Sequence, residues 1–171
     1  MKKLMIIGAG AAGVMCAIHA SVNYDVTIIE KNDKPGKKLF ITGKGRCNLT
    51  NDSDEETFLK NVVTNPKFLY SSIYGYDQNE VMRDFEKWGV NLKTERGGRV
   101  FPVSDHSSDI IKALTTELKK RRVKIIYNSK VTDLIYEELT QDDYKYIVKG
   151  VKTDKGVYNA DVVVIADRKS V

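Results

Sequence analysis

Apolar and polar positions in the first thirty residues predict a strand, a helix and a second strand. Residues 3–8 read as a buried strand, and residues 25–30, which contain the stretch VTII, read as a second strand. Residues 11–22 between them are rich in Ala and suit a helix. This order predicts two parallel strands joined by a right-handed crossover, and therefore a doubly wound sheet.

Helical periodicity follows in residues 53–89, where Val81, Phe85 and Trp88 are spaced i, i+4 and i+7. We interpret these three as core positions, and we expect Pro66 to separate two helices. Aromatic side chains in the same region could line a ligand pocket, but helical spacing favours packing for Phe68, Tyr70, Tyr74, Tyr76 and Trp88.

A turn at Gly97 and Gly98 and a short strand at residues 99–102 come next. Ser104 or Ser107 then caps a helix that runs to about residue 122. The helix dipole suits this assignment, since acidic residues occupy the predicted first turn and basic residues the end. These are Asp105 and Asp109, and Lys119, Lys120, Arg121 and Arg122.

The remaining chain predicts mainly strands. Residues 123–127 form one, and residues 130–159 form an antiparallel meander with turns at Asp142–Asp143 and Asp154–Gly156. Residues 160–166 read as a last strand buried on both faces. The predicted fold class is therefore α/β, a Rossmann-type dinucleotide-binding domain with a parallel central sheet and an attached antiparallel meander.

Composition narrows the class of protein. The 171 residues fit one domain, and 42% hydrophobic with 30% charged residues is typical of a soluble globular protein. The apolar run at residues 162–166 is too short to span a membrane, so no membrane partner is expected. Two cysteines are too few for a disulfide framework, which favours the cytoplasm over secretion.

Positive charge is concentrated in residues 34–46. Five basic residues and no acidic residue occur there, in a chain of net charge +5. Nucleic-acid binding is one reading of this pattern. The stretch is interleaved with glycines and not with stacking aromatics, so we prefer a loop around a small anion and expect no nucleic-acid partner.

The glycine motif carries the strongest chemical signal. Gly8, Gly10 and Gly13 follow a strand and open a helix, as in the dinucleotide-binding fingerprint. The first permits a tight turn, the second lets backbone approach a pyrophosphate, and the third lets helix and strand pack closely. Glu30 ends the next strand, where its carboxylate can accept hydrogen bonds from ribose hydroxyls and would repel a 2′-phosphate. FAD and NAD both remain open on these residues alone.

A second motif, at residues 36–51, resembles a known family. The sequence GKKLFITGKGRCNLTN is similar to the signature of the BaiN-like (YhiN-like) bacterial flavoproteins, a family of NAD(P)/FAD-dependent oxidoreductases. The block GRVFPVSD at residues 98–105 resembles the same family. The resemblance extends over residues 1–166, which we interpret as one Rossmann-type FAD-binding domain of the glutathione-reductase-like class, in which such a meander is expected.

The resemblance implies the cofactor and its contacts. The ADP portion of FAD would lie along Gly8, Gly10, Ala11, Ala12, Gly13, Glu30 and Lys31. The pyrophosphate and flavin would lie along Lys38, Thr42, Gly43, Gly45, Arg46, Cys47 and Asn48. Val131 would meet adenine through its backbone. NAD(P)H is the expected electron donor and a small molecule the expected substrate.

No catalytic or metal-binding residue can be named from the sequence. Cys47 lies beside Arg46 and could be a redox thiol, but it lacks a partner cysteine, so we prefer a packing role. Cys16 reads as core. His19 and His106 lack metal-ligand spacing and fit no catalytic triad.

The resemblance stops after Ala166. The family continues with a glycine turn, a substrate-binding domain and a C-terminal return, whereas this sequence reads DRKSV at residues 167–171. We therefore expect a truncated chain that lacks turnover, holds FAD weakly and self-associates through residues 162–165. Three functions stay open: the FAD-binding part of an enone or alkene reductase, a non-catalytic dinucleotide-binding fragment, and an NAD-binding module.

Overall fold

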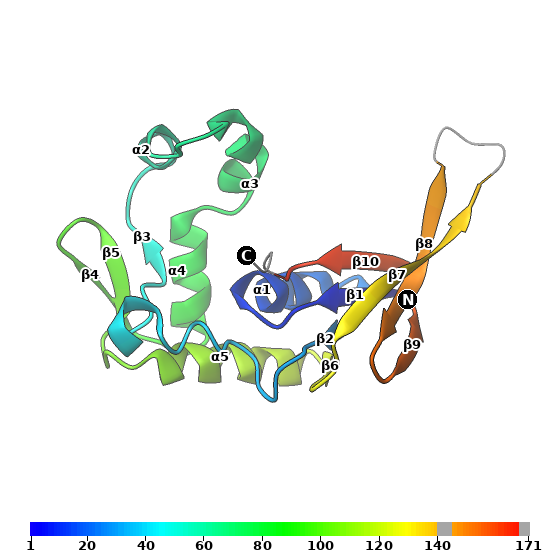
Figure 1. Ribbon diagram of the computed structural model, residues 1–171. Helices are drawn as coiled ribbons and strands as arrows, with labels where there is room; N and C mark the ends of the chain where they lie inside the picture. Colours follow the sequence, from blue (N-terminus) through cyan, green and yellow to red (C-terminus); the bar gives the residue numbers. More distant parts are fainter. Residues whose placement is uncertain (140–144, 168–171) are drawn as a thin grey trace. The chain divides into compact units, whose positions relative to one another are not determined.

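The computed structural model describes residues 1–139 and 145–167 (Figure 1). They form two compact units, one of Met1–Lys38 with Leu114–Val171 and one of Leu39–Ala113. The turn predicted at Asp142–Asp143 and residues 168–171 of the predicted tail lie outside the described residues.

A four-stranded parallel sheet forms the centre of the first unit, in the order β10-β1-β2-β6. Its strands are β1 (Lys2–Ile7), β2 (Tyr24–Ile29), β6 (Lys124–Ile126) and β10 (Val162–Ile165). In the register of β1 with its neighbours, Ile7 lies opposite Ile29 of β2 and Ile165 of β10. The predicted parallel sheet and the α/β fold class are confirmed.

Helix α1 (Ala11–Ala20) connects β1 to β2 and completes the predicted β–α–β unit. Val14, Ala17 and Ile18 on one side of the helix are buried, as expected for a helix that covers a sheet. Cys16 is half-buried, so the prediction of a core position holds only in part.

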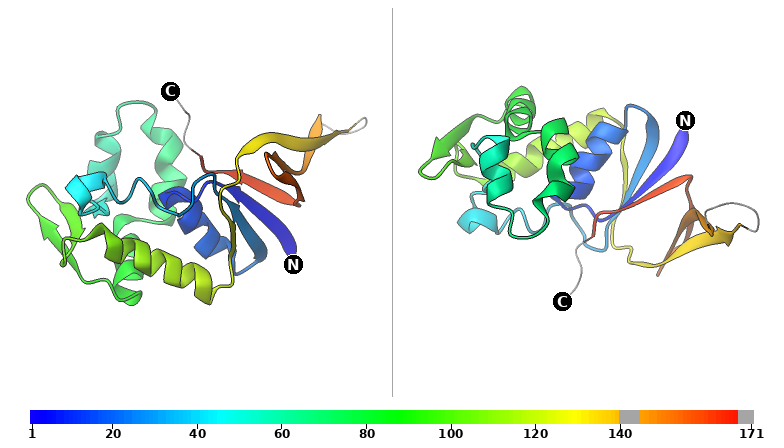
Figure 2. Two further views of the ribbon diagram at one scale, coloured as in Figure 1. Left: turned by 60° about the horizontal axis from the view of Figure 1, so that its bottom comes forward. Right: turned by 90° about the horizontal axis from the view of Figure 1, so that it is seen from above.

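The antiparallel meander is confirmed as strands β7 (Val131–Glu138), β8 (Tyr146–Thr153) and β9 (Gly156–Asn159). Met5 and Ile29 of the parallel sheet are buried in one cluster with Val151 and Ala160. Figure 2 shows the meander and α1 on opposite faces of the parallel sheet, and the cluster that includes Val151 of β8 lies on the meander side.

The prediction that residues 160–166 are buried on both faces is wrong. Strand β10 pairs with β1 and forms an edge of the sheet in the described part of the chain. Val162, Val163 and Val164 are half-buried, and Ile165 is 66% exposed. A continuous apolar run suits a covered strand and an edge strand alike, so the pattern could not decide between them.

The second unit contains the predicted helical region. The helices of this region are α2 (Glu55–Lys60), η2 (Pro66–Leu69), α3 (Tyr70–Gly75) and α4 (Gln78–Lys87), and the short segment η1 (Thr42–Gly45) precedes them. Pro66 is the first residue of η2 and does separate two helical segments, where its missing N–H is not needed. Asp77 caps α4, accepting a hydrogen bond from the backbone N–H of Glu80 at 2.7 Å.

Packing explains only some of the aromatic side chains in this unit. Of the three predicted core positions, Phe85 is buried, whereas Val81 and Trp88 are half-buried. The ring of Trp88 contacts that of Phe85 edge to face, with 5.0 Å between the ring centres. The same prediction is wrong for Phe68, Tyr70 and Tyr74, which are 79%, 47% and 57% exposed. Tyr76 is half-buried and donates a hydrogen bond to Asp84 at 2.8 Å.

A small antiparallel sheet completes the second unit, in the order β3-β5-β4. The sequence predicted β5 (Arg99–Pro102) and its preceding glycine turn, but not β3 (Thr50–Asn51) or β4 (Leu92–Glu95). Helix α5 (Ser107–Lys120) has Ser107 as its first helical residue, and the Ser107 hydroxyl donates to the carbonyl oxygen of Phe40 at 3.4 Å, so the predicted capping role stays a prediction. The helix ends at Lys120, two residues before the predicted end, with Lys119 and Lys120 in its last turn.

Candidate dinucleotide-binding site

The turn after β1 requires glycine at its first position. Gly8 has φ +101°, and its backbone N–H donates to Ile29 of β2 at 2.8 Å. A Cβ at Gly8 would lie 3.1 Å from the carbonyl oxygen of Ala166. Glycine accepts both the positive φ and the close contact, so the chain can turn tightly between strand and helix.

The other two glycines differ sharply in the space around them. A Cβ at the buried Gly13 would lie 1.9 Å from the carbonyl oxygen of Gly8, so helix and turn are in direct backbone contact there. A Cβ at the exposed Gly10 would meet nothing within 4 Å. Gly13 therefore allows the helix to pack directly against the turn, and Gly10 leaves open space beside the backbone.

Helix α1 presents its N-terminus to this open space. Gly10 is the N-cap residue, and no side chain caps the helix within the described residues. Ala11 and Ala12 in the first turn are exposed. The first backbone N–H groups of a helix lack intrahelical acceptors and carry the positive end of the helix dipole, so this end suits a phosphate.

Glu30 stabilises the turn. Its side chain is buried, and one carboxylate oxygen accepts a hydrogen bond from the N–H of Ala9 at 2.7 Å. The other accepts from the backbone N–H of Asn32 at 2.8 Å and from its Nδ2 at 2.5 Å. A carboxylate offers about four acceptor positions, so Glu30 retains capacity for a ribose hydroxyl. Burial, and after it the negative charge of Glu30, raises the pKa of Tyr127.

Two adjoining cavities lie at this edge of the sheet. The larger, of about 420 Å³, is lined by the glycine turn, Asn32, Ala166 and the basic loop that contains Gly36, Lys37 and Lys38. The smaller, of about 230 Å³, is lined by Ile29, Ser129, Lys130 and Val131. Four residues line both cavities: Gly8, Glu30, Lys31 and Asp167.

The structure brings part of the predicted site together. Gly8, Gly10, Glu30, Lys31 and Lys38 line the larger cavity. Val131 lines the smaller one, where adenine was predicted. The predicted residues Thr42, Gly43, Gly45, Arg46, Cys47 and Asn48 belong to the second unit.

Sequence reasoning missed several residues of the cavities. Ser129 is fully buried, and its hydroxyl has no hydrogen-bond partner among the described residues. It lies just beyond β6, and the carboxyl end of a parallel strand is where ligands of such sheets bind. Asp167 lies just beyond β10, in the corresponding position. Both residues could have been predicted from the sequence by the rule that ligands bind at the carboxyl ends of parallel strands.

The loop at residues 42–48 has an irregular backbone. Gly43, Lys44, Gly45 and Cys47 all have positive φ, which is uncommon for the two non-glycine residues. A Cβ at Gly43 would lie 2.9 Å from the backbone nitrogen of Asn48. With its amide nitrogen donating, the side chain of Asn48 bonds to the carbonyl oxygens of Val100 and Thr50 at 3.3 and 3.1 Å. The motif glycines therefore give the loop its shape.

Cys47 is a packed side chain. It is 1% exposed, and its backbone N–H donates to the carbonyl oxygen of Thr42 at 3.1 Å. Burial raises the pKa of the Cys47 thiol, whereas a reactive thiol needs a lowered pKa. The predicted packing of Cys47 is confirmed by its burial, and its predicted place beside the cofactor stays a prediction.

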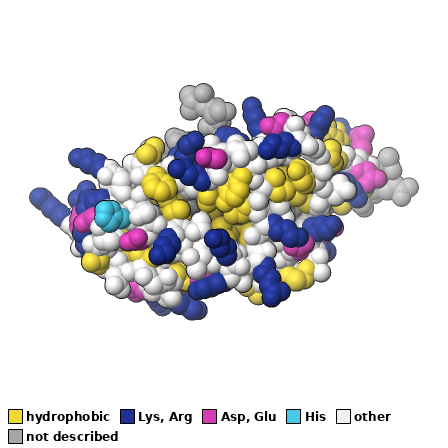
Figure 3. All heavy atoms as spheres, turned by 90° about the horizontal axis from the view of Figure 1, so that it is seen from below, with side chains coloured by type: hydrophobic (Ala, Val, Ile, Leu, Met, Phe, Trp, Pro, Cys, Tyr) yellow, Lys and Arg dark blue, Asp and Glu magenta, His cyan; other side chains and the backbone are white. Residues whose placement is uncertain are grey.

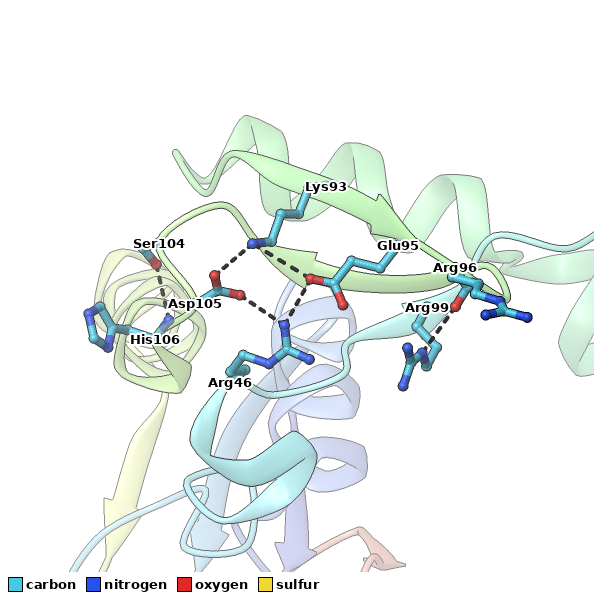
Figure 4. Close-up of polar contacts among 8 residues, drawn as sticks. All are labelled: Arg46, Lys93, Glu95, Arg96, Arg99, Ser104, Asp105 and His106. Carbon is cyan, nitrogen blue, oxygen red and sulfur yellow. Dashed lines mark hydrogen bonds and ion pairs between the residues drawn. The ribbon is translucent and has the colours of Figure 1, made fainter.

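Arg46 lies in a network of charged side chains (Figure 4). Its Nη1 donates to Glu95 at 2.8 Å and to Asp105 at 3.2 Å. Lys93 donates to the same Asp105 at 2.6 Å. The Arg46 guanidinium also lies 4.0 Å from the centre of the Phe101 ring, close enough for a cation–π contact. Arg46 binds two carboxylates in this structure, and its predicted contact with a phosphate or a flavin stays a prediction.

Asp105 is not in the first turn of α5, where the sequence placed it. It precedes the helix with φ +58°, and Asp109 is the acidic residue of the first turn. Hydrogen bonds from Lys93 and from Arg46 lower the pKa of Asp105. The side chain that was expected to balance the helix dipole instead joins β4 to the loop at Arg46.

Basic side chains are spread over the face shown in Figure 3, between apolar side chains, and do not form one continuous patch there.

Among the residues that the structure describes, no helix is long and apolar enough to cross a membrane.

A parallel sheet, a glycine turn against a helix N-terminus and an acidic residue at the end of β2 define a Rossmann-type dinucleotide-binding domain, of the kind that flavin-dependent oxidoreductases contain. The sequence agrees: residues 2–170 match the family described as the HI0933-like protein Rossmann domain. The chain belongs to this family.

Two curated proteins are similar to this chain in sequence over most of its length. It is 31% identical to the 3-dehydro-bile acid delta(4,6)-reductase of Clostridium scindens, over 97% of this chain and 39% of that protein. It is 32% identical to the ribosomal RNA dihydrouridine synthase of Escherichia coli, over 78% of this chain and 33% of that protein. The chain thus spans well under half the length of these relatives.

Solved structures support the fold. The 3-ketosteroid-delta4-(5alpha)-dehydrogenase of Rhodococcus jostii superposes with a TM-score of 0.65 at 16% identity, over 96% of this chain and 45% of that chain. A flavocytochrome c3 fumarate reductase superposes with a TM-score of 0.59 at 21% identity, over 96% of this chain and 33% of that chain.

Proposed function

We propose that this chain is the FAD-binding part of a flavin-dependent oxidoreductase that reduces a carbon–carbon double bond. The observation that carries the proposal is the difference between Gly10 and Gly13: one leaves open space beside a helix N-terminus, and the other holds the helix against the turn. A pyrophosphate fits such a cradle, because backbone N–H groups and the helix dipole face it.

The remaining ADP contacts follow from the cavities. The larger cavity would take the pyrophosphate, with Lys38 as a further cation beside Gly10. The smaller would take adenine, close to the backbone of Val131. Glu30 lines both and would meet the ribose, which favours a ribose without a 2′-phosphate.

The proposed reaction rests on two relatives. The names of the bile acid reductase and the dihydrouridine synthase both denote saturation of a carbon–carbon double bond. FAD, when bound, supplies a ring that accepts and delivers two electrons, and the protein positions it. We propose NAD(P)H as the electron donor and an unsaturated small molecule as the substrate.

Four measurements on the purified chain test this proposal and its alternatives. Calorimetric titration with ADP should show saturable binding at one site, and titration with FAD should quench flavin fluorescence. Competition experiments distinguish FAD binding from NAD binding. If NAD displaces ADP and FAD does not, the chain is an NAD-binding module. Turnover with NADH and an electron acceptor separates an active enzyme from a non-catalytic binding fragment.

The partly exposed strand β10 also supports proposed self-association. Ile165 is 66% exposed at a sheet edge, and an apolar edge strand offers unpaired backbone groups to a second chain. Light scattering after size-exclusion chromatography should show a dimer that dissociates when Ile165 is replaced by lysine. A wild-type monomer at all concentrations would contradict this.

We also place the protein in the cytoplasm, since Cys16 and Cys47 are both free thiols, as a reducing compartment maintains them. Cell fractionation tests this placement.

A further inference from the structure

One ion pair lies where the two cavities meet. Lys31 Nζ is 3.3 Å from a carboxylate oxygen of Asp167, and both side chains are about half exposed, at 49% and 44%. Lys31 follows Glu30 directly after β2, and Asp167 lies beyond β10, on the other side of β1. Both residues line both cavities. The pair therefore links the ends of two strands across the turn at Gly8.

A nucleoside diphosphate that occupied both cavities would lie next to the Lys31–Asp167 ion pair. The shared lining consists of the turn glycine, the carboxylate of Glu30 and the two paired side chains. Phosphate oxygens beside them would attract Lys31 and repel Asp167. Because Lys31 already has an acidic partner, the ligand must compete with Asp167 for the same ammonium group.

We propose that Asp167 is a specificity-determining residue that lowers the affinity of this site for the phosphate part of a dinucleotide by holding Lys31. The inference rests on the proposed binding of ADP at the glycine turn. It extends that proposal, because the proposed contacts of ADP with the glycine turn and with Glu30 do not include the carboxylate of Asp167. Adenosine lacks the phosphates, so Asp167 has little effect on its binding.

The first test compares Asp167→Asn with the wild-type chain by calorimetric titration with ADP and with adenosine. The substitution removes one negative charge from a half-exposed side chain and nearly preserves its shape, so the fold should remain intact by circular dichroism. ADP should bind about threefold to tenfold more tightly, the size expected for one charge near a protein surface. Adenosine affinity should not change. Raising the salt concentration to about 0.5 M should reduce the gain for ADP.

Two variants serve as controls. Asp25→Asn makes the same charge change at the opposite end of β2, away from both cavities, and should leave ADP affinity unchanged. Lys31→Gln should weaken ADP binding. In the Lys31→Gln background, Asp167→Asn should give a much smaller gain, since the lysine for which the carboxylate competes is absent.

The outcomes separate this inference from the proposed function. If the wild-type chain binds ADP and Asp167→Asn binds it equally or more weakly, the competition for Lys31 is refuted while the site stands. An equal gain for adenosine, or an undiminished gain in the Lys31→Gln background, also refutes it. If neither form binds ADP, both the inference and the proposed function are overturned.

Discussion

Replacing Gly13 by alanine tests the helix contact that defines the turn. On helix propensity alone this substitution should stabilise the protein by about 1 kcal/mol, because glycine is unfavourable inside a helix. The structure predicts the opposite. The new Cβ would lie 1.9 Å from the carbonyl oxygen of Gly8, and ordinary contact at 3.4 Å requires a displacement of about 1.5 Å.

The atom that must move belongs to the backbone of the turn, so a side-chain rotation cannot relieve the clash. Overpacking of this kind typically costs about 1–3 kcal/mol. We therefore expect Gly13→Ala to lower the free energy of unfolding by about 2 kcal/mol, measured by urea denaturation with an unchanged slope.

Gly10→Ala is the matched control. Its Cβ would meet nothing within 4 Å, so stability should change by less than about 0.5 kcal/mol. The added methyl group would occupy the space proposed for the pyrophosphate, and ADP affinity should fall. A Gly13→Ala variant as stable as the wild type would refute the close packing of helix and turn.

Three further predictions follow from the described contacts. Glu30→Gln should weaken ADP binding more than Cys47→Ser does, since Glu30 lines both cavities and Cys47 is a packed side chain; equal losses in calorimetry would contradict the ribose contact. Burial raises the pKa of both thiols, so Cys16 and Cys47 should react slowly with iodoacetamide near neutral pH and faster as the pH rises, by mass spectrometry; fast labelling of Cys47 at pH 7 would support a redox role instead. The pKa of Asp105 is lowered in the folded chain, so its carboxylate stabilises the fold above the unfolded pKa and loses this effect as the pH falls through the folded pKa. Asp105→Asn should therefore reduce the free energy of unfolding at pH 7, and this loss should shrink when urea denaturation is repeated at lower pH. A loss that does not change with pH would show that the charge is unimportant.

Hydrophobic patterning was sufficient to predict the parallel sheet, because β1 and β2 contain the mostly apolar stretches LMII and VTII on either side of an alanine-rich helix. It was insufficient for β4, whose sequence LKTE is short and mostly polar. That strand forms by pairing with β5 across the turn at Gly97 and Gly98, a contact that local pattern does not encode.

The candidate site divides in the same way. The glycine fingerprint requires a particular backbone geometry. The tight turn at Gly8, the close helix contact at Gly13 and the position of Glu30 at the end of β2 could therefore be predicted from spacing alone. Side chains whose partners are distant in sequence could not. Arg46 bonds to Glu95 and Asp105, 49 and 59 residues away, and Lys31 bonds to Asp167, 136 residues away.

Mapping ADP onto the backbone amides of the chain tests the central claim most directly. In a titration followed by ¹⁵N–¹H correlation spectra, we expect the largest saturable shifts at Gly10, Ala11 and Ala12, with smaller ones at Lys31 and Val131. Gly10→Val should abolish the shifts while leaving the rest of the spectrum unchanged. Saturable shifts that avoid the glycine turn, or no shifts at millimolar ADP, would contradict the claim that this turn binds the ADP part of the cofactor.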